Sequence, residues 1–262
     1  MGESAGRTWI LDCDGVIWLA DQAIPGSSEA VARLRHEGIR VVFLTNNSYP
    51  KVASHLEKLE KMGMPTEASD LISSPMAAAK MLERGENALV LGGPGVIEAL
   101  DGEGVRTFEP GAVPKGTKVD AVVVGFDLKF DFGRLAAATT ALRSGARLIG
   151  TNDDATFPAP EGLWPGAGSF LAAVSTAGGA KPQIAGKPYA PVADLVRASI
   201  GTVERVVGDR PSTDGRFAAE LGVAFGLVLS GVTPPDHGPI EPEPDAEADD
   251  LATLVEHLLG AD

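Results

Sequence analysis

The chain has 262 residues, of which 44% are hydrophobic and 22% are charged, a balance typical of a globular protein with a buried core. That length allows one large or two modest domains. The formal net charge of −14 argues against nucleic acid or an anionic membrane as a partner, because both are negatively charged. The same charge repels phosphorylated metabolites, so a phosphate site would need a positive local patch.

Cysteine usage and hydropathy point to the cytoplasm. The one cysteine, Cys13, cannot form an intrachain disulfide, which fits a reducing compartment. The segment from Met1 to Trp9 lacks the basic and apolar regions of a signal peptide. No stretch approaches the roughly 18 uninterrupted apolar residues of a membrane span. We therefore expect a cytoplasmic protein without a membrane partner.

Short apolar runs alternate with amphipathic segments along most of the chain, which predicts an α/β fold with a mostly parallel sheet. In the first third of the chain, strands are expected at 8–11, 40–44 and 71–73. Helices are expected at 27–36, 51–61 and 76–83. Ser27 or Ser28 is the expected cap of the first helix, and Gly38 and Gly63 the residues that end the first two.

A second set of strands and helices occupies the middle of the chain. Its strands are expected at 88–91, 121–124 and 147–150, and its helices at 132–144 and 170–177. Between the last strand and the last helix, residues 151–168 form an irregular stretch rich in proline and glycine. Such a stretch is longer than a plain connector, and long loops often carry function.

The last third of the chain repeats the first pattern. Strands are expected at 183–185, 203–207 and 224–229, and helices at 190–198, 215–221 and 251–259. Asp249 or Asp250 would cap the closing helix. Residues 233–245 are acidic and rich in proline, which predicts a loop.

Two carboxylates, Asp12 and Asp14, directly follow the first strand. Side chains alternate along an extended chain, so both carboxylates can face one side while Cys13 faces the other. Gly15 then allows a sharp turn. Neighbouring carboxylates repel one another unless a cation bridges them, and Mg²⁺ prefers such oxygen ligands. A solvated turn is the alternative when this motif is taken alone.

Polar residues also follow two later strands. Thr45, Asn46 and Asn47 could hold phosphate oxygens through a hydroxyl, amides and turn N–H groups, although a polar turn that caps a helix is the alternative. Lys187 stands between Gly186 and Pro188 after a strand, where it could neutralise a nucleophile and phosphate oxygens. A surface lysine is the alternative there.

A second acidic pair follows the strand at 203–207. Asp209 could bind the metal directly, while Asp214 could orient a metal-bound water or Lys187 from behind. The alternative is a loop in which Arg210 forms salt bridges with both carboxylates.

These four motifs, in this order and each after a strand, resemble those of the haloacid dehalogenase superfamily and, within it, of the class IIA (NagD-like) phosphatases. The resemblance spans the chain from Leu11 to about Leu259. It rests on Asp12-Cys13-Asp14-Gly15-Val16, Leu44-Thr45-Asn46-Asn47-Ser48, Gly186-Lys187-Pro188 and Gly208-Asp209-Arg210 with Thr213-Asp214. Gly215 departs from the pattern, because the family usually has isoleucine there.

The resemblance implies a Rossmann-like core at residues 1–85 and 182–262, interrupted by an α/β cap of the C2 type at 86–181. In the family the cap carries a loop that contacts the substrate, which corresponds here to residues 151–158 and implies substrate contacts from Asn152 and Asp154. Related caps dimerise, so a homodimer through the cap is compatible with the resemblance.

The resemblance also implies a Mg²⁺-dependent phosphomonoester hydrolase that works through an aspartyl-phosphate. Asp12 would be the nucleophile and Asp14 the general acid and base. The metal would be held by Asp12, the backbone carbonyl of Asp14 and Asp209, with Asp214 behind them. The phosphate oxygens would be held by Thr45, Asn46, Asn47 and Lys187.

Two other functions stay open on the same scaffold. A phosphotransferase or mutase would pass the phosphoryl group to a sugar hydroxyl instead of water, and a non-catalytic module would only bind it. The expected ligand is a small phosphorylated metabolite. Glycerol 3-phosphate or phosphoglycolate is preferred, and pyridoxal phosphate, p-nitrophenyl phosphate and nucleoside monophosphates are further candidates.

Overall fold

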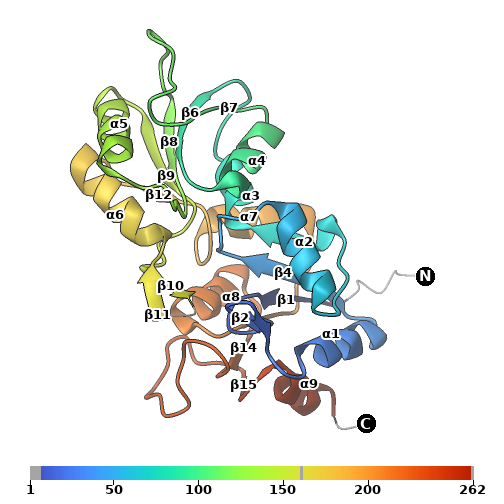
Figure 1. The fold of residues 1–262 in the computed structure, drawn as a ribbon. Helices are drawn as coiled ribbons and strands as arrows, with labels where there is room; N and C mark the ends of the chain where they lie inside the picture. The colour runs from blue at the N-terminus through green and yellow to red at the C-terminus, as the bar shows by residue number, and fades with distance from the viewer. Residues whose placement is uncertain (1–6, 160–161, 261–262) are drawn as a thin grey trace. The chain divides into compact units, whose positions relative to one another are not determined.

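The structure, a computed structural model, describes residues 7–159 and 162–260 (Figure 1). By its internal contacts the chain forms two compact units. The first comprises Met1–Thr45, Ala53–Ile72 and Ala193–Asp262, and the second comprises Asn46–Val52 and Ser73–Val192. The predicted core at 1–85 and 182–262 and the predicted cap at 86–181 stay predictions.

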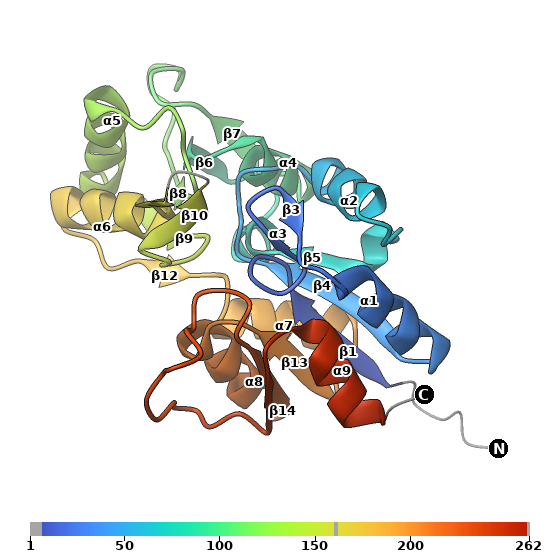
Figure 2. The same cartoon turned by 60° about the horizontal axis from the view of Figure 1, so that its bottom comes forward.

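The first unit is built on a six-stranded sheet in the order β15-β14-β13-β1-β4-β5. Its central strand β1 pairs in parallel with β13 and β4, so strands from both ends of the sequence, dark blue and orange, lie side by side (Figure 2). The strands are β1 Thr8–Asp12, β4 Arg40–Thr45, β5 Leu71–Ser73, β13 Arg205–Gly208, β14 Ala224–Val228 and β15 Ala246–Ala248.

Strands β1 and β4 contain continuous apolar runs, as expected for central strands of a parallel sheet that is covered on both faces. In β1, Trp9, Ile10 and Leu11 are all buried, and β4 is buried from Val41 onward. The register pairs Asp12 with Leu44 and Leu11 with Val207. The carboxyl ends of β1, β4 and β13 therefore meet at one edge of the sheet.

The helices of this unit confirm most of the predicted ones. They are α1 Ser27–His36, α2 Val52–Lys61, α8 Arg216–Leu221 and α9 Leu251–Leu259, and α7 Ala190–Ser199 continues from the second unit into the first. Asp250 caps α9 by accepting a hydrogen bond from the Thr253 N–H at 2.8 Å, as predicted. An α-helix was expected to begin at Gly215. Instead, Gly215 ends a π-helical turn, Pro211–Gly215, and α8 begins at Arg216.

The predicted cap of α1 was wrong. Gly26 stands at that position with a left-handed φ of 79° and without a side-chain bond. Ser27 is buried, and its hydroxyl donates to the carbonyl of Ile17 at 3.2 Å. That carbonyl belongs to the segment leading into a small hairpin, β2 Trp18–Leu19 and β3 Gln22–Ala23, which the sequence did not predict.

The second unit contains a five-stranded sheet in the order β12-β9-β8-β6-β7, in which every pair is parallel. Its strands are β6 Asn87–Leu91, β7 Arg106–Phe108, β8 Ala121–Val124, β9 Arg147–Gly150 and β12 Gln183–Ile184. Its helices are α3 Ser74–Ala79, α4 Pro94–Gly102, α5 Phe132–Arg143 and α6 Ala167–Gly178. Helices α5 and α6 pack on each other beside the buried face of β8.

The stretch at 151–168 is more regular than predicted. It contains an antiparallel hairpin, β10 Thr156–Ala159 and β11 Gly162–Pro165, and α6 begins three residues before the predicted start at 170. Across the described residues, no helix combines the length and the apolar character needed to cross a membrane.

Candidate active site

Asp12 is the last residue of β1, at the centre of the first unit's sheet. Its Oδ1 accepts a hydrogen bond from the Cys13 N–H at 2.8 Å, which fixes the carboxylate relative to the strand end. Cys13 is fully buried while Asp12 is partly exposed, as the alternation along an extended chain requires. The strand thus presents a carboxylate at its tip and keeps the thiol in the core.

Asp209 and Asp214 follow β13, the neighbour of β1. Asp209 is 4% exposed; its Oδ2 accepts from the Val232 N–H at 2.6 Å, and its backbone carbonyl accepts from the Thr233 hydroxyl at 2.6 Å. Asp214 is fully buried in the π-helical turn, and its Oδ2 accepts from the Arg210 N–H at 3.1 Å. Backbone N–H groups therefore orient both carboxylates.

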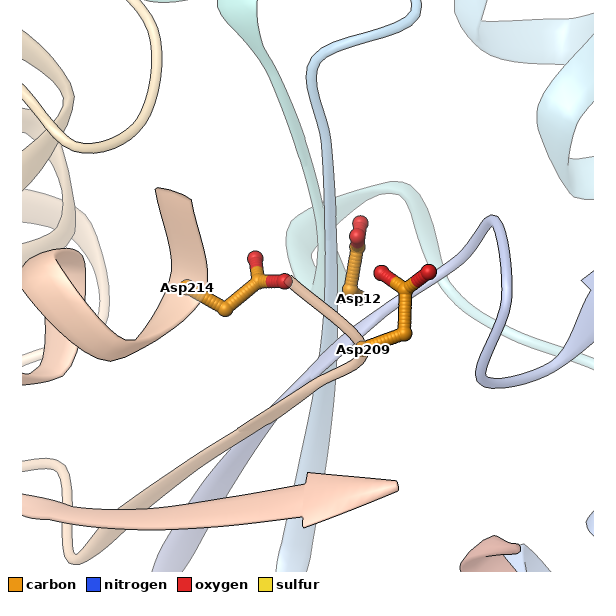
Figure 3. Close-up of side chains that lie close together, drawn as sticks. All are labelled: Asp12, Asp209 and Asp214. Carbon is orange, nitrogen blue, oxygen red and sulfur yellow. The ribbon is translucent and has the colours of Figure 1, made fainter. Parts of the chain in front are cut away.

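The side chains of Asp12, Asp209 and Asp214 lie close together (Figure 3). One carboxylate oxygen from each lies within 4.8 Å of the other two. Three carboxylates this close repel one another, and a cation bound among them would offset that repulsion. An all-oxygen donor set of this kind suits Mg²⁺, which binds a few carboxylates and keeps water or phosphate oxygens as its other ligands. The residues present therefore fit that ion.

Two glycines leave the space that the Asp209 carboxylate occupies. Gly15 has a left-handed φ of 82°, and a Cβ added there would meet the Asp209 carboxylate, as would a Cβ at Gly231. The hydroxyl of Ser230 donates to the Gly15 carbonyl at 2.7 Å and so joins the two loops. The motif loop after β1 and the loop after β14 close around Asp209 because neither carries a side chain at the point of contact.

The side chain of Asp14 has a separate environment in the first unit. Its Oδ1 accepts a hydrogen bond from the Trp18 indole N–H at 3.0 Å. In the part of the chain that the structure describes, the three-carboxylate cluster is formed by Asp12, Asp209 and Asp214 and does not include the Asp14 carboxylate. The sequence predicted that the metal contacts the backbone carbonyl of Asp14 and not its carboxylate. That contact stays a prediction.

Thr45 ends β4, one residue beyond the pair formed by Asp12 and Leu44, and is buried. It lies at the same sheet edge as the carboxylate cluster. The next residue, Asn46, belongs by its contacts to the second unit.

Within the second unit, Asn46 joins three of the other predicted site residues. Its amide nitrogen donates to Asp154 Oδ2 at 3.0 Å and to the Lys187 carbonyl at 3.2 Å, and its Oδ1 accepts from the Lys187 N–H at 3.0 Å. The Asn152 side chain donates to the Asn46 carbonyl at 2.8 Å. Lys187 is 2% exposed, so it is not the surface lysine that was the alternative.

Asn47 has a more local contact, because its Oδ1 accepts from the Tyr49 N–H at 3.2 Å. Three further residues contact predicted site residues of their own unit and were not predicted as part of a site: Ser74, whose hydroxyl donates to the Asn46 carbonyl at 3.0 Å in the second unit, and Trp18 and Gly231 in the first. No spacing in the sequence marks Ser74 or Gly231. Trp18 follows the acidic motif closely in the sequence, but core packing explains a tryptophan at that position equally well.

Comparisons with known proteins identify relatives across most of the chain. A family model described as haloacid dehalogenase-like hydrolase matches residues 9–106, and a second, described as haloacid dehalogenase hydrolase-like, matches residues 184–254. Phosphoglycolate phosphatase 2 of Arabidopsis thaliana is 34% identical over 86% of this chain and 83% of its own length. Glycerol-3-phosphate phosphatase of Gallus gallus is 34% identical over 86% of this chain and 80% of its own.

A solved structure has the same fold. The crystal structure of a glycerol phosphate phosphatase from Mycobacterium tuberculosis in complex with magnesium is 29% identical and superposes with a TM-score of 0.85. The match covers 95% of this chain and 76% of that one.

Proposed function

Because the chain belongs to the haloacid dehalogenase-like hydrolases and, within them, to the class IIA phosphatases, we propose that it is a Mg²⁺-dependent hydrolase of a small phosphomonoester. The observation that carries this proposal is the cluster of Asp12, Asp209 and Asp214 at neighbouring strand ends. A cluster of carboxylates at the carboxyl edge of a parallel sheet is a place where a metal and a phosphate can be held together.

Asp12, Asp209 and the backbone carbonyl of Asp14 would hold Mg²⁺, with Asp214 beside them. The bound ion would supply positive charge that draws the phosphoryl group to the carboxylates and offsets the charge that develops during transfer. Asp209 is suited to this role because the Val232 N–H and the two glycines fix it before any ion arrives.

Asp12 acts as the nucleophile in this proposal. Its carboxylate attacks phosphorus, the bond from phosphorus to the ester oxygen breaks, and Asp14 gives a proton to the departing oxygen. Asp14 then takes a proton from the water that attacks the aspartyl-phosphate, which releases inorganic phosphate and restores Asp12. The Cys13 N–H bond to Asp12 Oδ1 supports this assignment, because it restrains a carboxylate that must present one oxygen for attack.

The non-reacting phosphate oxygens would be held by Thr45, the backbone of Asn46, Asn47 and Lys187. The bonds between the Asn46 amide and the Lys187 main chain support this grouping, because they tie two of the proposed phosphate-binding segments together. Lys187 would supply the positive charge that a chain with a net charge of −14 needs at a phosphate site.

The preferred substrates are glycerol 3-phosphate and phosphoglycolate, because relatives with those activities in their names match most of the chain. Asn152 and Asp154 would contact the substrate beyond the phosphate, and their bonds to Asn46 support a position next to it. We also propose that the enzyme is cytoplasmic and, because of its negative charge, binds neither nucleic acid nor membrane. A homodimer through the cap is proposed as well, and light scattering tests whether the chain dimerises.

Phosphate release from a panel of phosphomonoesters with Mg²⁺ tests the function. The native chain is expected to hydrolyse at least one of the two preferred substrates, and Asp12→Asn is expected to lose turnover by at least about 10³-fold while keeping its circular dichroism spectrum. Asp236→Asn, which changes an exposed carboxylate of the same unit, is the matched control and is expected to keep native turnover. Full activity of Asp12→Asn would end the proposed mechanism.

A further inference from the structure

The loop that carries Asp14 returns directly to Trp18. The indole N–H donates to Asp14 Oδ1 at 3.0 Å. The backbones of the two residues form a β-bridge, and the Gly15 N–H donates to the Trp18 carbonyl at 2.7 Å. The Trp18 N–H in turn donates to the Cys13 carbonyl at 3.1 Å. The side-chain bond therefore lies inside a turn whose main chain is itself closed by hydrogen bonds, so it does not depend on chance placement of two surface groups.

Helix α2 holds the indole ring from outside the turn. The Lys58 ammonium lies 4.4 Å from the centre of the ring and donates to the Ala20 carbonyl at 2.6 Å. A cation over an indole face is attracted by the ring's electron density, and the bond to Ala20 fixes where that cation sits. Trp18 is thus held on one side by Lys58 and aims its polar edge at Asp14.

Packing alone does not explain this arrangement. Trp18 is 2% exposed, so its ring does fill space in the first unit. A buried ring that only fills space can leave its N–H to any carbonyl nearby, or be replaced by phenylalanine. Here the N–H bonds to the carboxylate that the proposed mechanism uses for proton transfer.

We propose that Trp18 is a positioning residue for Asp14. By holding Oδ1, the indole fixes the orientation of the carboxylate to which the proposed mechanism assigns proton transfer to the leaving group and from water. This inference rests on the proposed function, because it gives Asp14 the role of general acid and base. Lys58 contributes indirectly by holding the indole ring.

The choice of leaving group tests this role. An alkoxide leaves badly without a proton, whereas p-nitrophenolate is stable as an anion and gains little from an acid. Trp18→Phe keeps an aromatic ring and removes the N–H. We expect kcat for glycerol 3-phosphate to fall by about 10-fold or more, and kcat for p-nitrophenyl phosphate by less than about 3-fold.

Trp9→Phe is the matched control, since Trp9 is also a buried indole of the first unit, at 1% exposed. It is expected to leave the ratio of the two kcat values unchanged. Equal losses on both substrates in Trp18→Phe would overturn the positioning role while the phosphatase function stands. If Trp18→Phe does not fold, Lys58→Met tests the same arrangement, with a smaller loss selective for glycerol 3-phosphate expected and an equal loss on both substrates counting against it.

Nuclear magnetic resonance of the indole N–H groups tests the bond without any substrate or metal. The chain has three tryptophans, so three indole signals are expected, and the one that Trp18→Phe removes belongs to Trp18. Asp14→Ala is expected to move that signal more than the other two. A Trp18 signal that stays in place in Asp14→Ala would overturn the inference, and hydrolysis of neither substrate by the native chain would instead overturn the proposed function.

Discussion

Gly231 and Gly15 matter to the site through the space they leave. Each allows backbone to approach the Asp209 carboxylate where a Cβ would collide with it. At Gly15 the left-handed φ is a second reason for glycine, whereas Gly231 does not need it. A substitution at Gly231 therefore tests the effect of an added Cβ alone, without placing a non-glycine residue at a left-handed φ.

Gly231→Ala is expected to displace Asp209 and to weaken Mg²⁺ binding by about 10-fold or more, since groups that support a metal ligand typically contribute 10-fold to 100-fold to affinity. The measurement is the Mg²⁺ concentration that gives half-maximal phosphate release. Gly238→Ala is the control, because a Cβ at Gly238 would meet no atom within 4 Å. An unchanged Mg²⁺ requirement in Gly231→Ala would show that Asp209 does not need this space.

At the scale of single residues, the sequence was most informative where chemistry demands particular atoms. Asp12, Asp209 and Asp214 were predicted because neighbouring carboxylates suit a bridging cation and because the four motifs together resemble those of a known family, and the structure brings all three together. Ser74 and Gly231 could not be predicted. Their roles, a hydroxyl that reaches Asn46 and an absent Cβ, exist only once distant loops meet.

At the scale of elements, Asp120 fastens the start of β6 to the start of β8. Its Oδ2 accepts from the Asn87 N–H at 3.0 Å, and its own N–H donates to the Asn87 carbonyl at 2.8 Å. Lys118 donates to its Oδ1 at 2.8 Å. These hydrogen bonds lower the pKa of Asp120 below its ordinary value, the one from Lys118 most and the one from the Asn87 N–H next.

A lowered carboxyl pKa means that folding favours the charged form of Asp120. The charged carboxylate therefore stabilises the fold above its unfolded-state pKa of about 3.9, and this contribution is lost as the pH falls through the folded-state pKa. Asp120→Asn is expected to cost about 1 kcal/mol at pH 7, a value kept small because the side chain is 20% exposed. Urea unfolding at pH 7 and at progressively lower pH measures this. The difference between native chain and variant should shrink in acid, and a constant difference would contradict the assignment.

Regular elements with continuous apolar runs were predictable, and short ones were not. The strands at the centres of both sheets were predicted within one or two residues, because a run such as Val41–Leu44 can be buried only as a strand or a helix core. The strands β7 and β15 have three residues each and lack an apolar run, so their partners define them. The two strands β10 and β11 contain one proline each, which argued for a loop.

Two helices show a different limit of the sequence. No helix was predicted after the strand at 88–91, yet α4 runs there from Pro94 to Gly102. The third helix was expected at 76–83, whereas α3 runs from Ser74 to Ala79 because Pro75 is well placed in a first helical turn. Helix ends depend on local caps that several residues can supply, so their prediction is imprecise.

At the scale of the whole molecule, metal binding at the carboxylate cluster, as proposed, would stabilise the folded chain. Asp12 and Asp209 come from strands about 200 residues apart in sequence, so the unfolded chain has no comparable site. An ion that binds only the folded state stabilises it by about 2.7 kcal/mol at 100 times its Kd.

Mg²⁺ at that concentration is therefore expected to raise the Tm by about 5–10 °C for a chain of this size. Differential scanning calorimetry with and without EDTA measures the shift, independently of turnover. Asp209→Asn should lose most of it, whereas Asp236→Asn should keep it. An unchanged Tm of the native chain with and without Mg²⁺ would argue against a metal site at this cluster.

The position of β13 in the first sheet has a consequence for biosynthesis. Strand β1 needs β4 on one side and β13 on the other, and β13 spans Arg205–Gly208. A nascent chain of only the first two hundred residues therefore contains β1 and β4 but not β13. Asp12, the proposed nucleophile, can meet Asp209 and Asp214 only after the last quarter of the polypeptide has been synthesised, so a chain truncated before that region lacks the cluster.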